Sequence, residues 1–191
     1  MANIIHWDTE TTGLNNKVHG IISLSYLIDI DGKVVHRGKL TMNPLSYDRP
    51  VNKVSPKALE VNGYKESHLT DFPDAKAQCA NFISVLNKYI DRFDTKSYFI
   101  PAGFNVQFDN GFIQEWFKVC GYDSYGQYFT YKSLCCFEAI KWLQYLGKIN
   151  TGPSQNLSSC CKAIGLNITA HDSSVDIEST RDLFYKIKEL I

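Results

Sequence analysis

A chain of 191 residues with 44% hydrophobic and 13% aromatic side chains is long enough to bury a core without the help of disulfides or structural metals. We expect one domain over residues 1–191. Twenty basic residues balance twenty acidic ones, which argues against a protein that coats nucleic acid through many phosphate contacts. Because no apolar run approaches a membrane span and the first residues lack a signal-peptide pattern, we expect a cytoplasmic protein without a membrane partner.

The first third of the chain is predicted to form strands. An apolar start, Ala2–Ile5, leads into the motif His6–Leu14, and two β-rich segments follow at 21–28 and 34–42. An Asp-Gly pair between those two segments is a turn signal, so the three strands are expected to form an antiparallel meander.

Helices are expected to dominate the rest of the chain. A short helix is predicted over 55–63, because Ser-Pro is a helix start and Asn-Gly a helix stop. A connector that packs Leu59 and Val61 inward explains its residues as well as a segment that touches a ligand. The remaining pattern predicts a helix over 74–93, a buried strand over 98–102, a helix over 108–120, a loop and short strand over 123–131, and helices over 133–146, 157–164 and 173–190. These elements indicate a single α/β domain with a mixed sheet flanked by helices.

Six cysteines raise the question of disulfides or zinc. The sequence has no C-x-x-C, and the adjacent pairs Cys135-Cys136 and Cys160-Cys161 suit neither an unstrained bridge nor a zinc knuckle. Cysteine is often a small buried hydrophobe in reduced proteins, so free core thiols are the favoured interpretation.

Two acids stand at the end of the first predicted strand. Side chains i and i+2 share one face of a strand, so Asp8 and Glu10 would project together and repel each other unless a cation lies between them. Two solvated acids at the mouth of a loop are the alternative, which this spacing alone leaves open.

Two later motifs decide between these interpretations. Asn105-x-x-Phe108-Asp109 follows the predicted strand over 98–102, and His171-x-x-x-x-Asp176 lies near the C-terminus. With Asp8-Thr-Glu-Thr-Thr-Gly, these segments resemble the three motifs of the DEDDh 3′-to-5′ exonucleases, relatives of ribonuclease T and of polymerase proofreading subunits. The resemblance runs from residue 8 to residue 176 and implies a ribonuclease H-like sheet of five strands. Thr130-Tyr131 stands where many family members have Asp-Thr, which leaves that strand boundary uncertain.

The resemblance also implies a catalytic set. Asp8, Glu10, Asp109 and Asp176 would hold two divalent metal ions, Mg²⁺ or Mn²⁺, which prefer oxygen ligands. His171 would act as the general base, since an imidazole near its normal pKa can take a proton from water at neutral pH. The neighbouring Asp172 is interpreted as an exposed loop acid. The other histidines are interpreted as surface or capping residues, and they are His6, His19, His36 and His68.

Substrate contacts follow from the same resemblance. The backbone or the hydroxyls of Thr11 and Thr12 would hold the terminal 3′-OH, and Leu14 would press against the terminal base. Phe108 or Phe112 could stack on a base or sugar, although core packing is an equally good explanation of both. Asn105 is expected to order the turn of the second motif. The helix over 55–63 would lie beside the site in this family.

The sequence therefore predicts a metal-dependent exonuclease domain that removes nucleoside 5′-monophosphates from the 3′ end of single-stranded DNA or RNA. A polymerase or a second copy of the chain is a candidate partner. One alternative is a catalytically silent nucleic-acid-binding or polymerase-partner module of the same fold, which the complete set of five catalytic residue types argues against. A metal-dependent phosphatase of unrelated fold is a third interpretation, which the order of the three motifs weakens.

Overall fold

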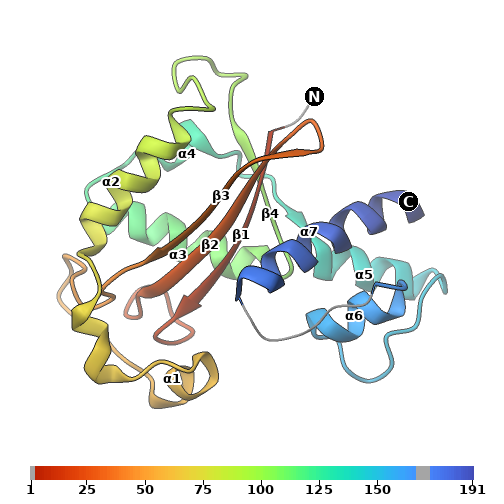
Figure 1. Cartoon of the computed structure of the whole chain (residues 1–191), viewed down its shortest axis with the longest axis horizontal. Coiled ribbons are helices and arrows are strands. Elements are labelled where there is room, and N and C mark those ends of the chain that lie inside the picture. The colour runs from red at the N-terminus through yellow and green to blue at the C-terminus, as the bar shows by residue number, and fades with distance from the viewer. Residues whose placement is uncertain (1–2, 167–172) are drawn as a thin grey trace.

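The protein is built on a five-stranded sheet with the order β3-β2-β1-β4-β5 (Figure 1). The computed structural model describes residues 3–166 and 173–191, and for residues 173–176 it describes the backbone only. The strands are β1 (Asn3–Thr11), β2 (Ile21–Ile30), β3 (Lys33–Thr41), β4 (Phe99–Gly103) and β5 (Leu134–Cys135). The first three strands pair antiparallel, and β4 and β5 join in parallel. The expected meander and mixed sheet are confirmed, and β1 is the central strand.

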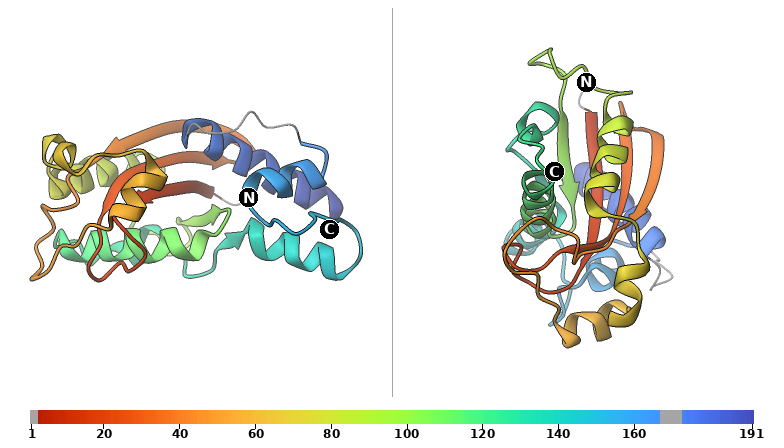
Figure 2. Two further views of the ribbon diagram at one scale, coloured as in Figure 1. Left: turned by 90° about the horizontal axis from the view of Figure 1, so that it is seen from below. Right: turned by 90° about the vertical axis from the view of Figure 1, so that its left-hand side faces the viewer.

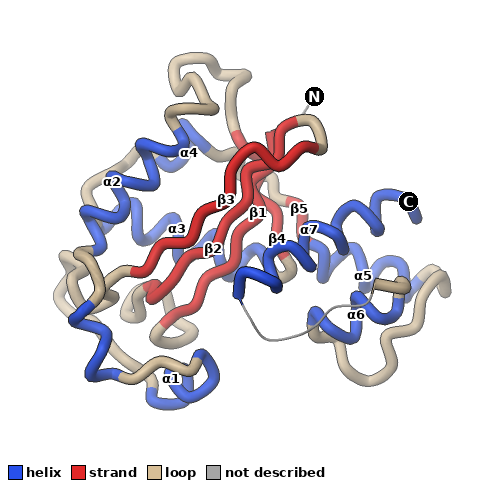
Figure 3. Tube along the Cα trace, in the orientation of Figure 1, coloured by secondary structure: helices blue, strands red, loops and turns tan. Residues whose placement is uncertain are grey.

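Helices cover both faces of this sheet, as the secondary-structure view in Figure 3 shows. They are α1 (Pro56–Asn62), the 3₁₀ helix η1 (Glu66–Asp71), α2 (Ala75–Leu86), α3 (Val106–Val119), α4 (Tyr125–Tyr128), α5 (Cys136–Tyr145), α6 (Leu157–Ala163) and α7 (Ser173–Leu190). Seen from below, α3 lies under the strands and α7 lies above them (Figure 2). None of the helices in the described part of the chain is long and apolar enough to cross a membrane.

Helix α1 begins and ends where its sequence signals predict. The Ser55 side chain accepts a hydrogen bond from the backbone N–H of Ala58, and Gly63 ends the helix with a left-handed backbone at φ +71°. The prediction for its apolar face is only half correct. Leu59 is buried, whereas Val61 is 72% exposed, because it faces the cavity beside Glu10.

Three element boundaries differ from the sequence prediction. Helix α2 ends at Leu86 rather than near residue 93, because the chain turns there while Ile90 still packs into the core. The segment 123–131 forms the short helix α4 and then a single bridge between Phe129 and Phe99. Residues 134–135, predicted to be helical, form the edge strand β5. In each case tertiary packing overrides a local apolar pattern.

The described residues form an aromatic core against the sheet and a separate cluster between helices. An aromatic core that includes Trp7, Phe82 and Trp116 joins the sheet to α2 and α3. On the right in Figure 1, α5, α6 and α7 pack around a second cluster that contains Cys136, Cys160, Cys161, Leu183 and Ile187. All six cysteines are free and five are buried, which confirms the prediction of core thiols.

Candidate active site

Asp8 and Glu10 lie on one face of the central strand. Both are half-buried, while the intervening Thr9 and the preceding Trp7 are buried against the opposite layer. This alternation is what a strand requires of residues two apart. The structure therefore places the two acids side by side along β1, as their spacing predicts.

Asp109 reaches this strand from the first turn of α3. Its Oδ1 atom accepts two hydrogen bonds from Thr9, one from the backbone N–H at 2.9 Å and one from the hydroxyl at 2.7 Å. A second bond ties the same two elements together, because the Trp7 Nε1–H donates to Asn110 Oδ1 at 3.0 Å. Thr9 was not singled out from the sequence, although its place between two same-face acids directs it toward α3.

The surroundings of Asp109 disfavour its negative charge. The side chain is buried, and this burial raises its pKa to about 8. The Asp8 carboxylate acts in the same direction, while the two bonds from Thr9 oppose it. Two carboxylates are thus held close together in a dry environment where a cation would stabilise both. Carboxylate oxygens are also the ligands that Mg²⁺ and Mn²⁺ prefer, so these residues fit such an ion.

The remaining members of the predicted set are only partly placed. Among the described side chains, no three His, Cys, Asp or Glu residues form a group that could hold a metal ion. Asp176 lies in the first turn of α7, where only the backbone is described. His171 and Asp172 lie outside the described residues. The structure brings Asp8 and Asp109 together, and the convergence of the full set stays a prediction.

A cavity of about 600 Å³ opens beside Glu10. It is enclosed by the end of β1, the loop that follows it and helix α1. Leu14, which is 86% exposed, and the half-buried Phe108 both line it. A side-chain amide fixes one wall, since Asn62 Nδ2 donates to the Thr11 carbonyl oxygen at 2.9 Å. A pocket of this size suits a small ligand.

The hydroxyls of Thr11 and Thr12 in the first motif form hydrogen bonds within the protein. The Thr11 hydroxyl donates to the Gly13 carbonyl oxygen at 2.8 Å. Thr12 is fully buried, and its hydroxyl donates to the Lys53 carbonyl oxygen and accepts from the Gly20 N–H. The Thr12 hydroxyl thus has partners within the protein, and a contact of Thr11 or Thr12 with the 3′-OH stays a prediction. The bonds of the Thr12 hydroxyl join the loop to the segment before α1.

The two phenylalanines of the second motif and the helix that follows it have different environments. Phe112 belongs to the aromatic core with 2% of its area exposed, so its assignment as a substrate contact is wrong. Its ring packs against Phe108 at 4.9 Å between centroids, and only Phe108 reaches the cavity. Asn105 occupies the N-cap position of α3, but its exposed side chain makes no capping hydrogen bond.

His6 corrects another prediction. The expected position is at the surface, yet the residue is fully buried on the same face of β1 as Asp8, with its ring edge-on to Phe184 of α7 at 5.4 Å. Neither ring nitrogen has a hydrogen-bond partner among the described residues. Burial lowers the pKa of His6 to about 4, so the ring is neutral at physiological pH. The strict alternation with Asp8 was the signal that could have placed it beneath a covering helix.

The comparisons with known proteins agree with this arrangement. The model of the RNase T family, described as exonuclease, matches residues 5–184. The chain belongs to this exonuclease family. It is 24% identical over 188 residues to the DNA polymerase III PolC-type protein of Staphylococcus haemolyticus, an alignment that covers 97% of this chain and 11% of the polymerase.

Solved structures show the same fold. The E. coli exonuclease I complex with a dT13 oligonucleotide superposes with a TM-score of 0.75 at 18% identity, over 99% of this chain and 41% of that one. The ExoI/SSB-Ct complex gives a TM-score of 0.78 at 17% identity, with the same coverage of each chain. This exonuclease family member therefore has the expected ribonuclease H-like fold, and it spans about two fifths of the exonuclease I chains.

Proposed function

We propose that the chain is a metal-dependent 3′-to-5′ exonuclease that releases nucleoside 5′-monophosphates from single-stranded DNA or RNA. The observation that carries this proposal is the buried Asp109 beside the half-buried Asp8, next to a cavity that opens to solvent. Membership in the exonuclease family supports it. The fold shared with an exonuclease I that was solved with dT13 adds support for a single-stranded substrate.

Four acids would hold the metal ions. Asp8, Glu10, Asp109 and Asp176 offer the hard oxygen ligands that two Mg²⁺ or Mn²⁺ ions require. When bound, such ions lower the pKa of water and stabilise the charge that develops on the phosphoryl and leaving oxygens. The two bonds from Thr9 to Oδ1 of Asp109 would keep this ligand oriented before any ion arrives.

The protein's other residues would position substrate and move a proton. His171 accepts a proton from the water whose oxygen attacks phosphorus, the bond from phosphorus to the 3′-oxygen of the preceding nucleotide breaks, and that oxygen takes up a proton from solvent. The products are a nucleoside 5′-monophosphate and a new 3′-OH. The cavity takes the terminal nucleoside, with Leu14 and Phe108 against its base or sugar, because aromatic and apolar faces tolerate any base.

The setting of this activity is also proposed. Residues 1–191 act as one exonuclease domain, with the 3′ end of a single strand as substrate and a polymerase or a second copy as protein partner. The polymerase is suggested by the PolC-type relative. The six free cysteines fit a reducing compartment such as the cytoplasm.

A gel assay tests the activity directly. Matched 5′-labelled single-stranded DNA and RNA oligonucleotides are incubated with Mg²⁺ or EDTA, using the parent protein and Asp109→Asn. The substituted amide keeps an acceptor for both Thr9 bonds but removes the charge. We expect a ladder that shortens from the 3′ end with Mg²⁺ in the parent alone. Binding without shortening would instead indicate the silent module.

A further inference from the structure

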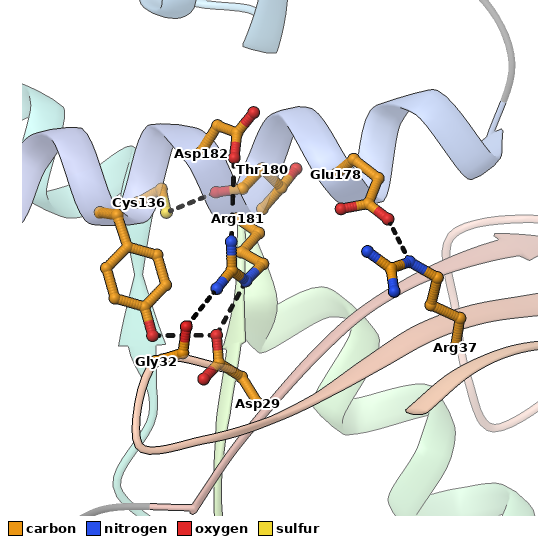
Figure 4. A network of polar contacts seen from close by, with 9 residues as sticks. Asp29, Gly32, Arg37, Cys136, Glu178, Thr180, Arg181 and Asp182 are labelled. Carbon is orange, nitrogen blue, oxygen red and sulfur yellow. Dashed lines mark hydrogen bonds and ion pairs between the residues drawn. The ribbon is translucent and has the colours of Figure 1, made fainter. Parts of the chain in front are cut away.

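Helix α7 is fastened to the sheet by a buried charged network (Figure 4). Arg181 Nε donates to Asp29 Oδ2 on β2 at 2.8 Å, and its Nη2 donates to the Gly32 carbonyl oxygen at 2.9 Å. The Tyr185 hydroxyl donates to the same Asp29 oxygen at 2.9 Å. The Asp29 side chain is 1% exposed and that of Arg181 is 17% exposed, so these bonds are made largely away from water.

The second ion pair between α7 and the sheet is of a different kind. Arg37 of β3 bonds Glu178 at 2.7 Å, but both side chains are well exposed, and such pairs contribute little. The apolar contacts through Leu183 and Ile187 are not directional, so alone they tolerate sliding and rotation of the helix. Arg181 differs because its planar guanidinium makes two bonds at fixed angles to two points of the β2–β3 hairpin.

We propose that Arg181 is a positioning residue that sets the rotation and axial position of α7, and thereby delivers Asp176 to the acids of β1. The inference rests on the proposed function. Asp176 precedes Arg181 by five residues in the same helix, which is about 7.5 Å along the axis. Slippage by one residue would move it about 1.5 Å and turn it about 100°. Coordination of Mg²⁺ demands near-ideal geometry, so such a shift would cost metal affinity.

A set of variants separates positioning from simple stabilisation. Arg181→Met removes the anchor, whereas the double variant Asp29→Leu with Arg181→Met replaces the whole ion pair by apolar side chains, a change that often restores stability. Arg37→Gln is the matched control, because it breaks the exposed bond to the same helix. For each protein the melting temperature is measured in EDTA and in Mg²⁺, and turnover of a single-stranded oligonucleotide is measured against Mg²⁺ concentration.

The two roles predict different results. With positioning, Arg181→Met shows a smaller rise in melting temperature on adding Mg²⁺, and its half-maximal Mg²⁺ concentration increases by roughly tenfold or more. Its kcat falls while its KM for the oligonucleotide changes little. The double variant regains the melting temperature in EDTA but keeps the weakened response to Mg²⁺. Arg37→Gln behaves as the parent does.

Several outcomes would overturn the inference. A parent-like Mg²⁺ response in the double variant would show that the ion pair serves stability alone, and a parent-like response in Arg181→Met would do the same. If the double variant does not fold, Tyr185→Phe decides the question, since it removes one bond to Asp29 and should weaken the Mg²⁺ response in the same direction. A parent protein that neither gains stability from Mg²⁺ nor shortens oligonucleotides would refute the proposed function itself.

Discussion

Replacing Asp109 by asparagine should stabilise the metal-free protein at neutral pH while it abolishes turnover. The carboxyl is buried and its pKa is raised from 3.8 to about 8. Between these values the folded protein holds a proton that the unfolded chain has released, so the stability of the parent falls as pH rises. From pH 4.5 to pH 7 this amounts to about 3 kcal/mol, at 1.36 kcal/mol per pH unit. The amide of the Asp109→Asn variant does not titrate, so the variant lacks this loss.

Urea denaturation in EDTA at pH 4.5 and pH 7 measures the effect. The free energy of unfolding of Asp109→Asn, relative to the parent, should increase between the two pH values. Asp123→Asn, which makes the same substitution outside the site, is the control variant. In saturating Mg²⁺ the order should reverse, because a bound cation favours the aspartate. A difference between variant and parent that stays constant with pH would refute the reasoning.

Three further predictions concern the same region. In the parent, the free energy of unfolding should fall by about 3 kcal/mol as the pH drops from 6.5 to 4, because the unfolded chain binds a proton there and the buried His6 ring does not. His6→Leu should remove this loss, which urea denaturation at pH 4.5 and pH 7 measures. Gly13→Ala should raise the KM for oligonucleotides, because a Cβ there would lie 2.5 Å from the His19 ring at the cavity wall, and unchanged kinetics would contradict this. Phe112→Ala should lower the free energy of unfolding by about 3–5 kcal/mol, whereas Phe108→Ala should mainly raise KM, and equal losses of stability in both variants would contradict the assignment.

Signals between neighbouring residues in the sequence were enough to predict several of the main strands and helices. The alternation of Asp8 and Glu10, the Ser-Pro start of α1 and the apolar repeat of α7 each depend on neighbours in the sequence, and the structure reproduces them. The same is true of Asp109 in the first turn of α3.

The errors arose where a residue's environment is set by a distant segment. His6 is covered by Phe184, which lies far along the chain, so the alternation with Asp8 gives the face of β1 on which His6 lies but not the helix that covers that face. Phe108 and Phe112 stand one turn apart, and only the packing of α3 on the aromatic core decides which of them reaches the cavity. The Thr12 hydroxyl likewise forms hydrogen bonds with the carbonyl oxygen of Lys53 and the N–H of Gly20, and Lys53 lies 41 residues away in the sequence.

The bond between Thr9 and Asp109 joins residues 100 positions apart, and the anchor of α7 joins residues 152 positions apart. Contacts of such long range are slow to form, because closing the intervening loop costs chain entropy before the contact stabilises the fold. A growing chain that has completed the β1–β3 meander and α3 would still lack the acid on α7. Local detachment of α7 from a finished molecule would have the same effect, since one helix can open without global unfolding. If Asp176 is a metal ligand, as proposed, attachment of α7 would be the last step in assembling a site whose other acids lie on β1 and α3.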